Sequence, residues 1–360
     1  MIPHYSKIHN RFQINGMHHH KDGLVDFAYS CIKEGEPFEK TIGNFMLNWL
    51  DEKDYIEAKT SGSTGDPKTI RLSKQSMVHS AIASGDYFKL EPGDKILHCL
   101  PSDYIAGKMM FVRAIILGLE LDLVEPTSQP IFDYNMPYDF CAMVPLQLQR
   151  TYQYCENINT IIVGGAAVPQ DLCKKLEDLK TSVFATYGMT ETLSHIAVKP
   201  LNEAALKKDS SFKSLPAFYK TFPKVHISQD EQNCLVIEAE HLFEGKLVTN
   251  DIVEILSPNT FEFLGRFDNV INSGGVKLFP EQIEKKLSSK IDDRFFITSI
   301  KDNELGEKVV LVLESESIDL EKNCFNGLDK FETPREILNI PEFVETKSGK
   351  IQKEKTLALL

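Results

Sequence analysis

The sequence predicts an α/β fold with a large N-terminal α/β domain and a small α+β domain behind it. The β-branched run at residues 160–163 ends in Gly164-Gly165, which is typical of a buried strand followed by a turn. Residues 169–180 then carry three leucines on one stripe, which indicates a helix. Because strands alternate with helices in this way, polar loops should gather at the carboxyl ends of the strands, where open α/β sheets bind ligands.

The pattern changes after Arg266, so we expect the large domain to span residues 1–267 and the small domain residues 268–360. The small domain is predicted to contain, in order, a strand near Val270, a turn at 272–275, a helix at 280–287, strands at 295–299 and 308–314, and a weak helix at 328–337 cut by Pro334.

Composition excludes several classes of partner. The 360 residues are 42% hydrophobic, enough for a sizeable core, and the formal charge is −12. Binding to nucleic acid or to an anionic membrane needs clustered excess Lys and Arg, so a small-molecule partner is favoured. The most apolar stretch, residues 109–119, is interrupted by Arg113, and the N-terminus lacks a signal-peptide pattern. We therefore expect a cytoplasmic protein with no membrane span.

The seven cysteines form no C-x-x-C pair, so we expect reduced thiols and neither disulfides nor structural zinc. The tract Met17-His18-His19-His20 could hold a metal, but three successive histidines cannot all face one ion. We expect a flexible loop there.

Residues 60–68 read TSGSTGDPK, and their hydroxyls, glycines and lysine have the composition of a polyphosphate-binding loop. The pattern is not a Walker loop, since the glycines are three apart and Pro67 precedes Lys68. Taken alone, an ordinary flexible Gly/Ser loop is the alternative.

This loop resembles the signature loop of the adenylate-forming superfamily, which includes acyl-CoA synthetases and peptide-synthetase adenylation domains. Further segments match in the family's order, from residue 60 to residue 353: GGA at 164–166, YGMTE at 187–191, TND at 249–251, GRFD at 265–268, GG at 274–275 and SGK at 348–350. The resemblance implies the adenylate-forming fold, whose small C-terminal domain is mobile. It also implies ATP and Mg²⁺ as cofactors and coenzyme A as co-substrate.

The resemblance implies a role for each matched residue. Phosphates would be held by Thr60, Ser61, Gly62, Ser63, Thr64, Gly65 and Lys68, with Thr190 also contacting phosphate and Glu191 binding magnesium. Adenine would lie against Gly164, Gly165 and Ala166 and stack on Tyr187, which Gly188 follows; Asp251 and Arg266 would bind the ribose. For Asp251 and Arg266 the alternatives are a surface turn and an ordinary ion pair.

The resemblance also implies a catalytic role for Lys350. In the family this lysine neutralises charge that develops between the substrate carboxylate and the α-phosphate. Asp268 is then the hinge about which the small domain rotates after adenylation, bringing Gly274 and Gly275 to line the thiol channel. Considered alone, Lys350 would be a solvated lysine.

The chain also departs from the family pattern. Asn250 replaces the glycine before the ribose aspartate, and Tyr104 stands where a histidine commonly follows L-P-x-x. Only 59 residues precede the phosphate loop, so we expect a shortened N-terminal subdomain before residue 60 and an acid pocket with fewer walls.

Among the branches of the superfamily, the chain most resembles the o-succinylbenzoate–CoA ligases of menaquinone biosynthesis. That substrate carries a second carboxylate, for which Lys108 and Arg113 could supply a cation and Ser194 and His195 hydrogen bonds, near Tyr104. Both cations could instead be charges on a helix surface. The alternatives for the whole protein are an enzyme that adenylates another acid and loads it onto coenzyme A or a carrier protein, and a non-catalytic binding protein of the same fold. The sequence leaves the oligomeric state open.

Overall fold

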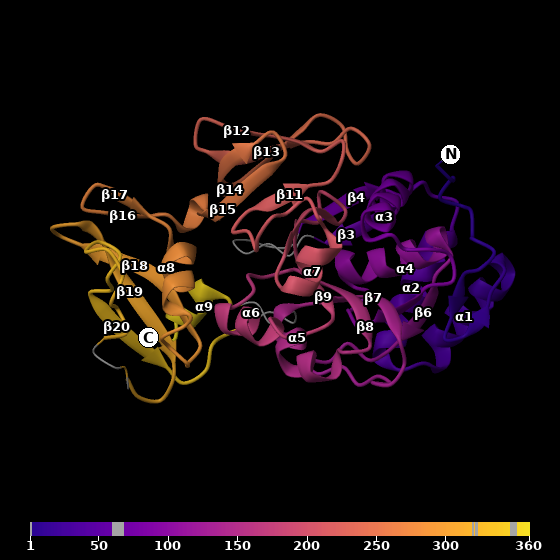
Figure 1. Cartoon of the computed structure of the whole chain (residues 1–360), viewed down its shortest axis with the longest axis horizontal. Coiled ribbons are helices and arrows are strands. Elements are labelled where there is room, and N and C mark those ends of the chain that lie inside the picture. Colours follow the sequence, from indigo (N-terminus) through magenta and orange to yellow (C-terminus); the bar gives the residue numbers. More distant parts are fainter. Residues whose placement is uncertain (1, 60–67, 319, 321–322, 346–350) are drawn as a thin grey trace. The chain divides into compact units, whose positions relative to one another are not determined.

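The chain folds into two compact units, which we describe separately (Figure 1). The computed structural model describes residues 2–59, 68–318, 320, 323–345 and 351–360. The first unit contains residues 1–168, 175–226 and 238–245, and the second contains residues 169–174, 227–237 and 246–360. Asp268 lies inside the second unit, and the domain boundary after residue 267 stays a prediction.

The first unit is built on a largely parallel sheet with the strand order β11-β10-β9-β8-β7-β5-β6-β1-β2. Every neighbouring pair from β9 to β1 is parallel, whereas β10, β11 and β2 pair antiparallel with their neighbours. The strands are β1 (Gln13–Ile14), β2 (Met17–His18), β5 (Lys95–His98), β6 (Glu120–Leu123), β7 (Tyr138–Met143), β8 (Ile158–Val163), β9 (Ser182–Gly188), β10 (His195–Pro200) and β11 (Tyr219–Thr221), with β3 (Tyr55–Lys59) and β4 (Thr69–Ser73) as a separate antiparallel pair.

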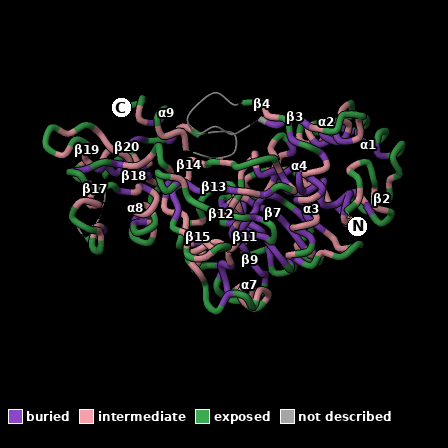
Figure 2. The backbone as a smooth tube through the Cα atoms, turned by 90° about the horizontal axis from the view of Figure 1, so that it is seen from above, coloured by how far each residue is buried: buried purple, intermediate pink, exposed green. Residues whose placement is uncertain are grey.

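The helices that accompany this sheet are α1 (Lys21–Glu34), α2 (Pro37–Leu50), α3 (Lys74–Phe88), α4 (Ile105–Leu117), α5 (Pro145–Thr151), α6 (Gln170–Leu176) and α7 (Glu203–Lys208), together with the short 3₁₀ turn η1 (Tyr152–Tyr154). The strands β7 to β9 are nearly continuous apolar runs, as expected for parallel strands covered on both faces. Figure 2 shows the buried parts of the backbone gathered on such strands and on α3 and α4. The predicted α/β body is therefore confirmed.

The histidine tract is not the flexible loop that we expected. Met17 and His18 form β2, which pairs with β1 across the two-residue turn Asn15-Gly16, and His20 caps α1. Both turn residues have positive φ, which asparagine and glycine adopt readily and which matches the twist of a tight hairpin. The Asn-Gly pair was the signal for this hairpin in the sequence.

The second unit combines an antiparallel ribbon with a small α+β body. The ribbon has the order β12-β13-β14-β15, from β12 (His226–Gln229), β13 (Cys234–Glu238), β14 (Lys246–Ser257) and β15 (Thr260–Arg266). The body contains η2 (Phe267–Asn269), β16 (Ile271–Ser273), β17 (Val276–Leu278), α8 (Pro280–Leu287), β18 (Phe295–Asp302), β19 (Gly306–Glu314), β20 (Glu336–Ile340) and α9 (Lys353–Leu357). Its strands are ordered β17-β16-β19-β18, with β20 also paired to β19. The division between the units passes through α6, β12 and β13.

Helix α8 has the predicted bounds because each local signal agrees. Pro280 occupies the first turn, two lysines lie in the last turn, and Ile283 and Leu287 are fully buried one turn apart. The predicted helix at 328–337 is wrong, since β20 starts at Glu336 and turns precede it. Pro334 disfavours a helix, and the Arg335 amide instead donates to the Val309 carbonyl at 2.9 Å.

No helix in the described part of the chain is long and apolar enough to cross a membrane.

Candidate functional site

The candidate site in the first unit lies at the carboxyl edge of the parallel strands. Gly164 directly follows β8, and Thr190 and Glu191 follow β9, its parallel neighbour. Because parallel strands end at the same edge, the matched segments 164–166 and 187–191 come together there, although they lie more than twenty residues apart in sequence.

The turn after β8 requires glycine for a reason internal to the protein. A Cβ on Gly164 would lie 2.4 Å from Oγ1 of Thr186, which itself donates to the Val163 carbonyl at 3.1 Å. Gly165 has φ of +85°, a conformation that other residues rarely adopt. The expectation that these glycines admit a nucleotide stays a prediction, but the packing of β9 against this turn already excludes a side chain at Gly164.

A tight hairpin between β9 and β10 holds Thr190 and Glu191. Thr192 is fully buried, and its hydroxyl oxygen accepts from the Met189 amide at 2.9 Å, while the Leu193 amide donates to the Thr190 carbonyl at 3.0 Å. Gly188 is required here too, because a Cβ would lie 2.3 Å from the Ser194 carbonyl oxygen. The turn is therefore fixed by its own bonds, with Thr190 and Glu191 half-buried at its tip.

Next to this hairpin, a cluster around Arg113 joins α3, α4 and the start of β10. The guanidinium of Arg113 donates to Ser194 Oγ at 2.6 Å and lies 3.5 Å from His195 Nδ1. Ser84 Oγ lies 3.3 Å from His195 Nε2. Since Arg113 can only donate, His195 Nδ1 must accept, and its Nε2–H is left to donate to Ser84. The structure thus brings together three of the five residues predicted for the second carboxylate, namely Arg113, Ser194 and His195.

Burial sets the protonation state of this cluster. Removal from water, together with the charge of Arg113, holds the pKa of His195 well below its usual range, so the imidazole is neutral. Burial also lowers the pKa of Arg113 to about 10, which still leaves it charged near pH 7. Arg113 is only 2% exposed, so the alternative of a helix-surface charge is wrong for this residue.

No carboxylate among the described residues pairs with Arg113. Its guanidinium contacts a hydroxyl, an imidazole and the sulfur of Met110 at 3.7 Å, and its Nε is buried with no hydrogen-bond partner. A buried cation without a counter-ion is costly, which is why such groups usually have a carboxylate or a bound anion beside them. The cluster is therefore suited to an anionic ligand.

Lys108 does not join this cluster. Its ammonium donates to the backbone carbonyls of Ser102 and Asp103, both at 2.7 Å, and lies over the ring of Phe45. Lys108 and Arg113 are five residues apart on α4, which puts them on different faces of the helix. Tyr104, the other predicted pocket residue, is half-buried and caps the N-terminus of α4.

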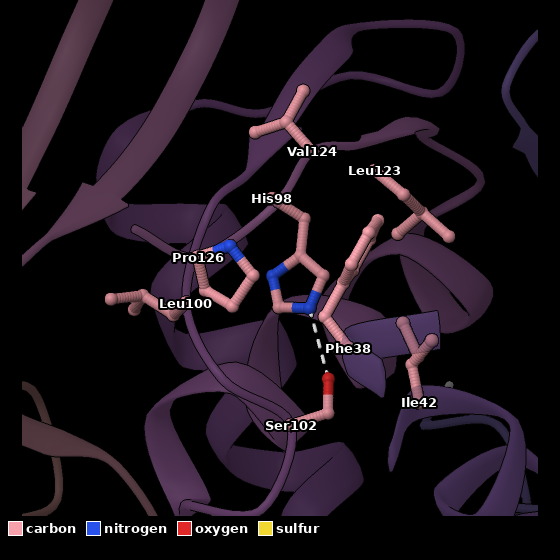
Figure 3. Close-up of a pocket in the computed structure, with 8 residues that line it drawn as sticks. All are labelled: Phe38, Ile42, His98, Leu100, Ser102, Leu123, Val124 and Pro126. Atoms are coloured by element: carbon pink, nitrogen blue, oxygen red, sulfur yellow. Dashed lines mark hydrogen bonds between the residues drawn. The ribbon is translucent and has the colours of Figure 1, made fainter. Parts of the chain in front are cut away.

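A second polar group at the same edge was not predicted from the sequence. His98, at the end of β5, is buried, and its Nε2 lies 3.0 Å from Ser102 Oγ (Figure 3). Its Nδ1 has no partner, and burial lowers its pKa to about 4. The cavity beside it measures about 10 Å³ and is otherwise lined by the apolar residues Phe38, Ile42, Leu100, Leu123, Val124 and Pro126. A space of this size suits a single water molecule.

In the second unit, the predicted ribose residues face each other across the ribbon. Asp251 on β14 pairs in register with Arg266 on β15, and the Arg266 Nε lies 3.8 Å from the Asp251 carboxylate. Asn250, the departure from the family pattern, donates to the carboxylate of Asp268, the predicted hinge residue in η2. These four side chains therefore form two pairs, Asp251 with Arg266 and Asn250 with Asp268.

Gly274 and Gly275 form the turn between β16 and β17, both with positive φ. A Cβ on Gly274 would lie 3.1 Å from the ring of Phe331, whereas nothing lies within 4 Å of that position on Gly275. Gly275 therefore offers an open backbone surface, and its predicted role in the thiol channel stays a prediction.

Several predicted residues lie outside the described part of the chain. They are Thr60, Ser61, Gly62, Ser63, Thr64, Gly65 and Lys350. The residues that flank the stretch 60–67 are described. Lys59 of β3 pairs with Thr69 of β4, and Lys68 is exposed. The described residues contain no group of three or more His, Cys, Asp or Glu that could hold a metal by itself.

Comparison with known proteins agrees with this geometry. Residues 59–225 match the AMP-binding enzyme family. The chain is 34% identical to an acyl-CoA synthetase (AMP-forming)/AMP-acid ligase II-like protein from Dyadobacter fermentans, with a TM-score of 0.59, over 93% of this chain and 98% of that one. The chain belongs to the AMP-binding enzyme family.

Two further relatives place this AMP-binding enzyme more closely. It is 25% identical to the 2-succinylbenzoate–CoA ligase of Listeria innocua, over 93% of this chain and 76% of the relative. Its fold matches that of the o-succinylbenzoate CoA synthetase of Bacillus subtilis, which was solved in complex with the acyl-adenylate intermediate. The TM-score is 0.70 and the identity 20%, over 83% of this chain and 68% of that one. The predicted adenylate-forming fold is thus confirmed.

Sequence reasoning missed two members of the site in this AMP-binding enzyme. Ser84, which holds His195, is one of several small polar residues on α3, and nothing in its local pattern distinguishes it. His98 ends β5, and a histidine at the end of an apolar strand was the available signal.

Proposed function

We propose that this AMP-binding enzyme is an ATP-dependent acid–CoA ligase whose acid is o-succinylbenzoate. The observation that carries the proposal is Arg113, a buried cation with no carboxylate partner among the described residues, held by Ser194 and His195 beside the Thr190–Glu191 turn. A substrate with two carboxylates supplies one for activation and one for Arg113. The relatives named above as 2-succinylbenzoate–CoA ligases support the same acid.

In the first half-reaction, a carboxylate oxygen of the acid attacks the α-phosphorus of ATP. A new C–O–P bond forms, the bond to the leaving pyrophosphate breaks, and negative charge builds up on the phosphoryl oxygens. Lys350 neutralises this charge in the transition state, where such stabilisation accelerates the reaction. Lys68 and the hydroxyls of residues 60–64 hold the departing phosphates.

Glu191 is suited to hold Mg²⁺ together with those phosphates. Mg²⁺ is usually bound by one or two carboxylates plus substrate phosphates, so a single half-buried Glu191 at the tip of a fixed turn fits. When bound, the ion would neutralise negative charge on the phosphates. Tyr187 stacks on the adenine, and the paired Asp251 and Arg266 hold the ribose hydroxyls.

In the second half-reaction, the thiol sulfur of coenzyme A attacks the acyl carbonyl. The thioester forms, AMP leaves with the bonding electron pair, and Gly274-Gly275 line the path of the thiol. The small domain rotates about Asp268 between the two reactions, so Lys350 serves adenylation only.

The proposal is tested by measuring the two half-reactions of the Lys350→Ala variant separately. ATP–pyrophosphate exchange with o-succinylbenzoate should fall below detection, while coenzyme A should still attack preformed acyl-adenylate at nearly the original rate. The matched control is Lys355→Ala, because Lys355 is exposed on α9 and has no proposed role. An equal loss in both half-reactions would contradict the proposal that Lys350 acts in adenylation only.

The thiol acceptor is tested in the same assay. Thioester should form with coenzyme A alone, and a requirement for a carrier protein would assign the enzyme instead to carrier-protein loading.

A further inference from the structure

The segment that follows Lys350 is fixed to the body of the second unit by an ion pair. Lys353, at the start of α9, places its ammonium 2.8 Å from Oε1 of Glu284 on α8. The same oxygen accepts from the Ile297 amide at 2.8 Å, and Lys353 also donates to the Ile297 carbonyl at 3.3 Å. These bonds connect α9, α8 and β18 at one point.

Apolar contacts reinforce the ion pair. The Lys353 ammonium lies 5.3 Å from the centre of the Phe296 ring, and Phe296 packs against Phe343. Ile351 and Leu357, on either side of Lys353, pack on the same small core. The two side chains of the pair are 31% and 26% exposed, so water weakens their attraction less than in a surface pair.

The residues before the stretch 346–350 are bonded to the residues after it. Glu345 and Ile351 form an antiparallel bridge, the Gln352 amide donates to the Val344 carbonyl at 2.8 Å, and the Gln352 side chain donates to the Glu345 carbonyl at 2.9 Å. The fully buried Thr356 accepts from the Val344 amide at 3.1 Å. The two described ends of the stretch 346–350 are therefore bonded to each other, and Lys353 joins them to α8 and β18.

We propose that Glu284 and Lys353 are positioning residues for adenylation, which anchor the ends of the stretch carrying Lys350 and so set where its ammonium can reach. The proposal rests on the proposed function, because it assigns Lys350 to the first half-reaction. An ion pair that merely stabilised the unit would affect both half-reactions alike. An anchor for Lys350 acts on adenylation, since misplacement of a catalytic group by about 1 Å costs on the order of a hundredfold in rate.

The variants that test this anchor are Lys353→Met, Lys353→Arg and Glu284→Gln. The matched control is Lys286→Met, which removes another α8 ion pair, with Glu332 at 2.6 Å, that includes no residue of the segment 344–356. For Lys353→Met we expect the kcat of ATP–pyrophosphate exchange to fall by about tenfold to a hundredfold, with an unchanged KM for ATP. Attack of coenzyme A on preformed acyl-adenylate should change less than twofold, Lys353→Arg should recover most of the loss, and Lys286→Met should match the original enzyme.

Amide hydrogen exchange gives a second readout that does not depend on the substrate. Peptides covering residues 351–356 should exchange at least tenfold faster in Lys353→Met and Glu284→Gln than in Lys286→Met, because their amides lose the anchor. The proposal would be overturned by unchanged amide hydrogen exchange in Lys353→Met and Glu284→Gln. Equal loss of rate in both half-reactions would overturn it as well. If the original enzyme adenylates no acid, the proposed function fails. The amide hydrogen-exchange rates then still decide whether Glu284 and Lys353 anchor this segment.

Discussion

Two cations, Arg113 and Lys353, show how differently the two units use a positive charge. Arg113 in the first unit is fully buried and has only neutral partners among the described residues, whereas Lys353 in the second unit is half-buried and paired with Glu284. A cation that already has its carboxylate holds elements of the protein together. A cation without one is available to the carboxylate of a ligand, at some cost to the stability of the free protein.

The largest expected effect is that of Arg113→Met on substrate use. The ratio kcat/KM for o-succinylbenzoate should fall by about thirtyfold or more, since truncating one partner of a buried charge pair costs roughly 2–5 kcal/mol. KM for ATP should stay within twofold. Steady-state kinetics with each substrate varied in turn checks this, and an unchanged KM for the acid would remove Arg113 from the pocket.

His98 is another buried basic group, and unlike Arg113 it is neutral at pH 7 because burial lowers its pKa. Its pKa is lowered to about 4 in the folded protein, against 6.5 for an ordinary histidine. The unfolded chain therefore binds a proton that the folded chain does not between these values, and stability falls as the pH drops through this window. The difference amounts to about 3 kcal/mol.

The variant that checks the pH effect is His98→Gln, with the exposed His226→Gln as its control. Trp49, the single tryptophan of the chain, is buried in the first unit, so its fluorescence reports urea unfolding there. The loss of stability from pH 7 to pH 4 should be smaller in His98→Gln than in the original protein. Parallel pH curves would show that His98 takes up a proton while folded.

Arg113→Met and Lys353→Met should have smaller effects on the free energy of unfolding, and the two effects should have opposite signs. Arg113→Met removes an unpaired buried charge, so the Trp49 unfolding midpoint should stay the same or rise. Lys353→Met leaves Glu284 without its partner and should lower the stability of the second unit by about 1–2 kcal/mol. Far-UV circular dichroism during urea unfolding measures the latter. A marked loss of stability in Arg113→Met would indicate that the cluster is structural.

The smallest effect concerns Ser84. Ser84→Ala removes the acceptor of the His195 Nε2–H, which loosens the imidazole beside Arg113. KM for o-succinylbenzoate should rise about threefold to tenfold, as expected for the loss of one neutral hydrogen bond. A Ser80→Ala control keeps the serine that contacts His195, and equal effects of the two variants would contradict the assigned role.

The sequence predicted those parts of the molecule that local signals determine. Helix α8 was found with its bounds because Pro280, the buried Ile283 and Leu287, and the terminal lysines agree. The predicted helix at 328–337 failed because β20 is set by pairing with β19, a contact distant in sequence. Lys108 and Arg113 looked equivalent as predicted cations, and only the three-dimensional structure separates them, since the face of α4 decides which one is buried with Ser194. Ser84 could not be predicted, because its importance comes from His195, which lies 111 residues away.

The central claim is that Arg113 selects an acid with a second carboxylate, and ATP–pyrophosphate exchange tests it most directly. The enzyme is given o-succinylbenzoate or either of the two monocarboxylate analogues that each lack one of its carboxyl groups. We predict rapid exchange with o-succinylbenzoate and at least about thirtyfold lower kcat/KM with both analogues. Arg113→Met should lose the preference over the analogue that keeps the reacting carboxylate. Equal exchange with a monocarboxylate acid, or exchange with no acid at all, would contradict the account.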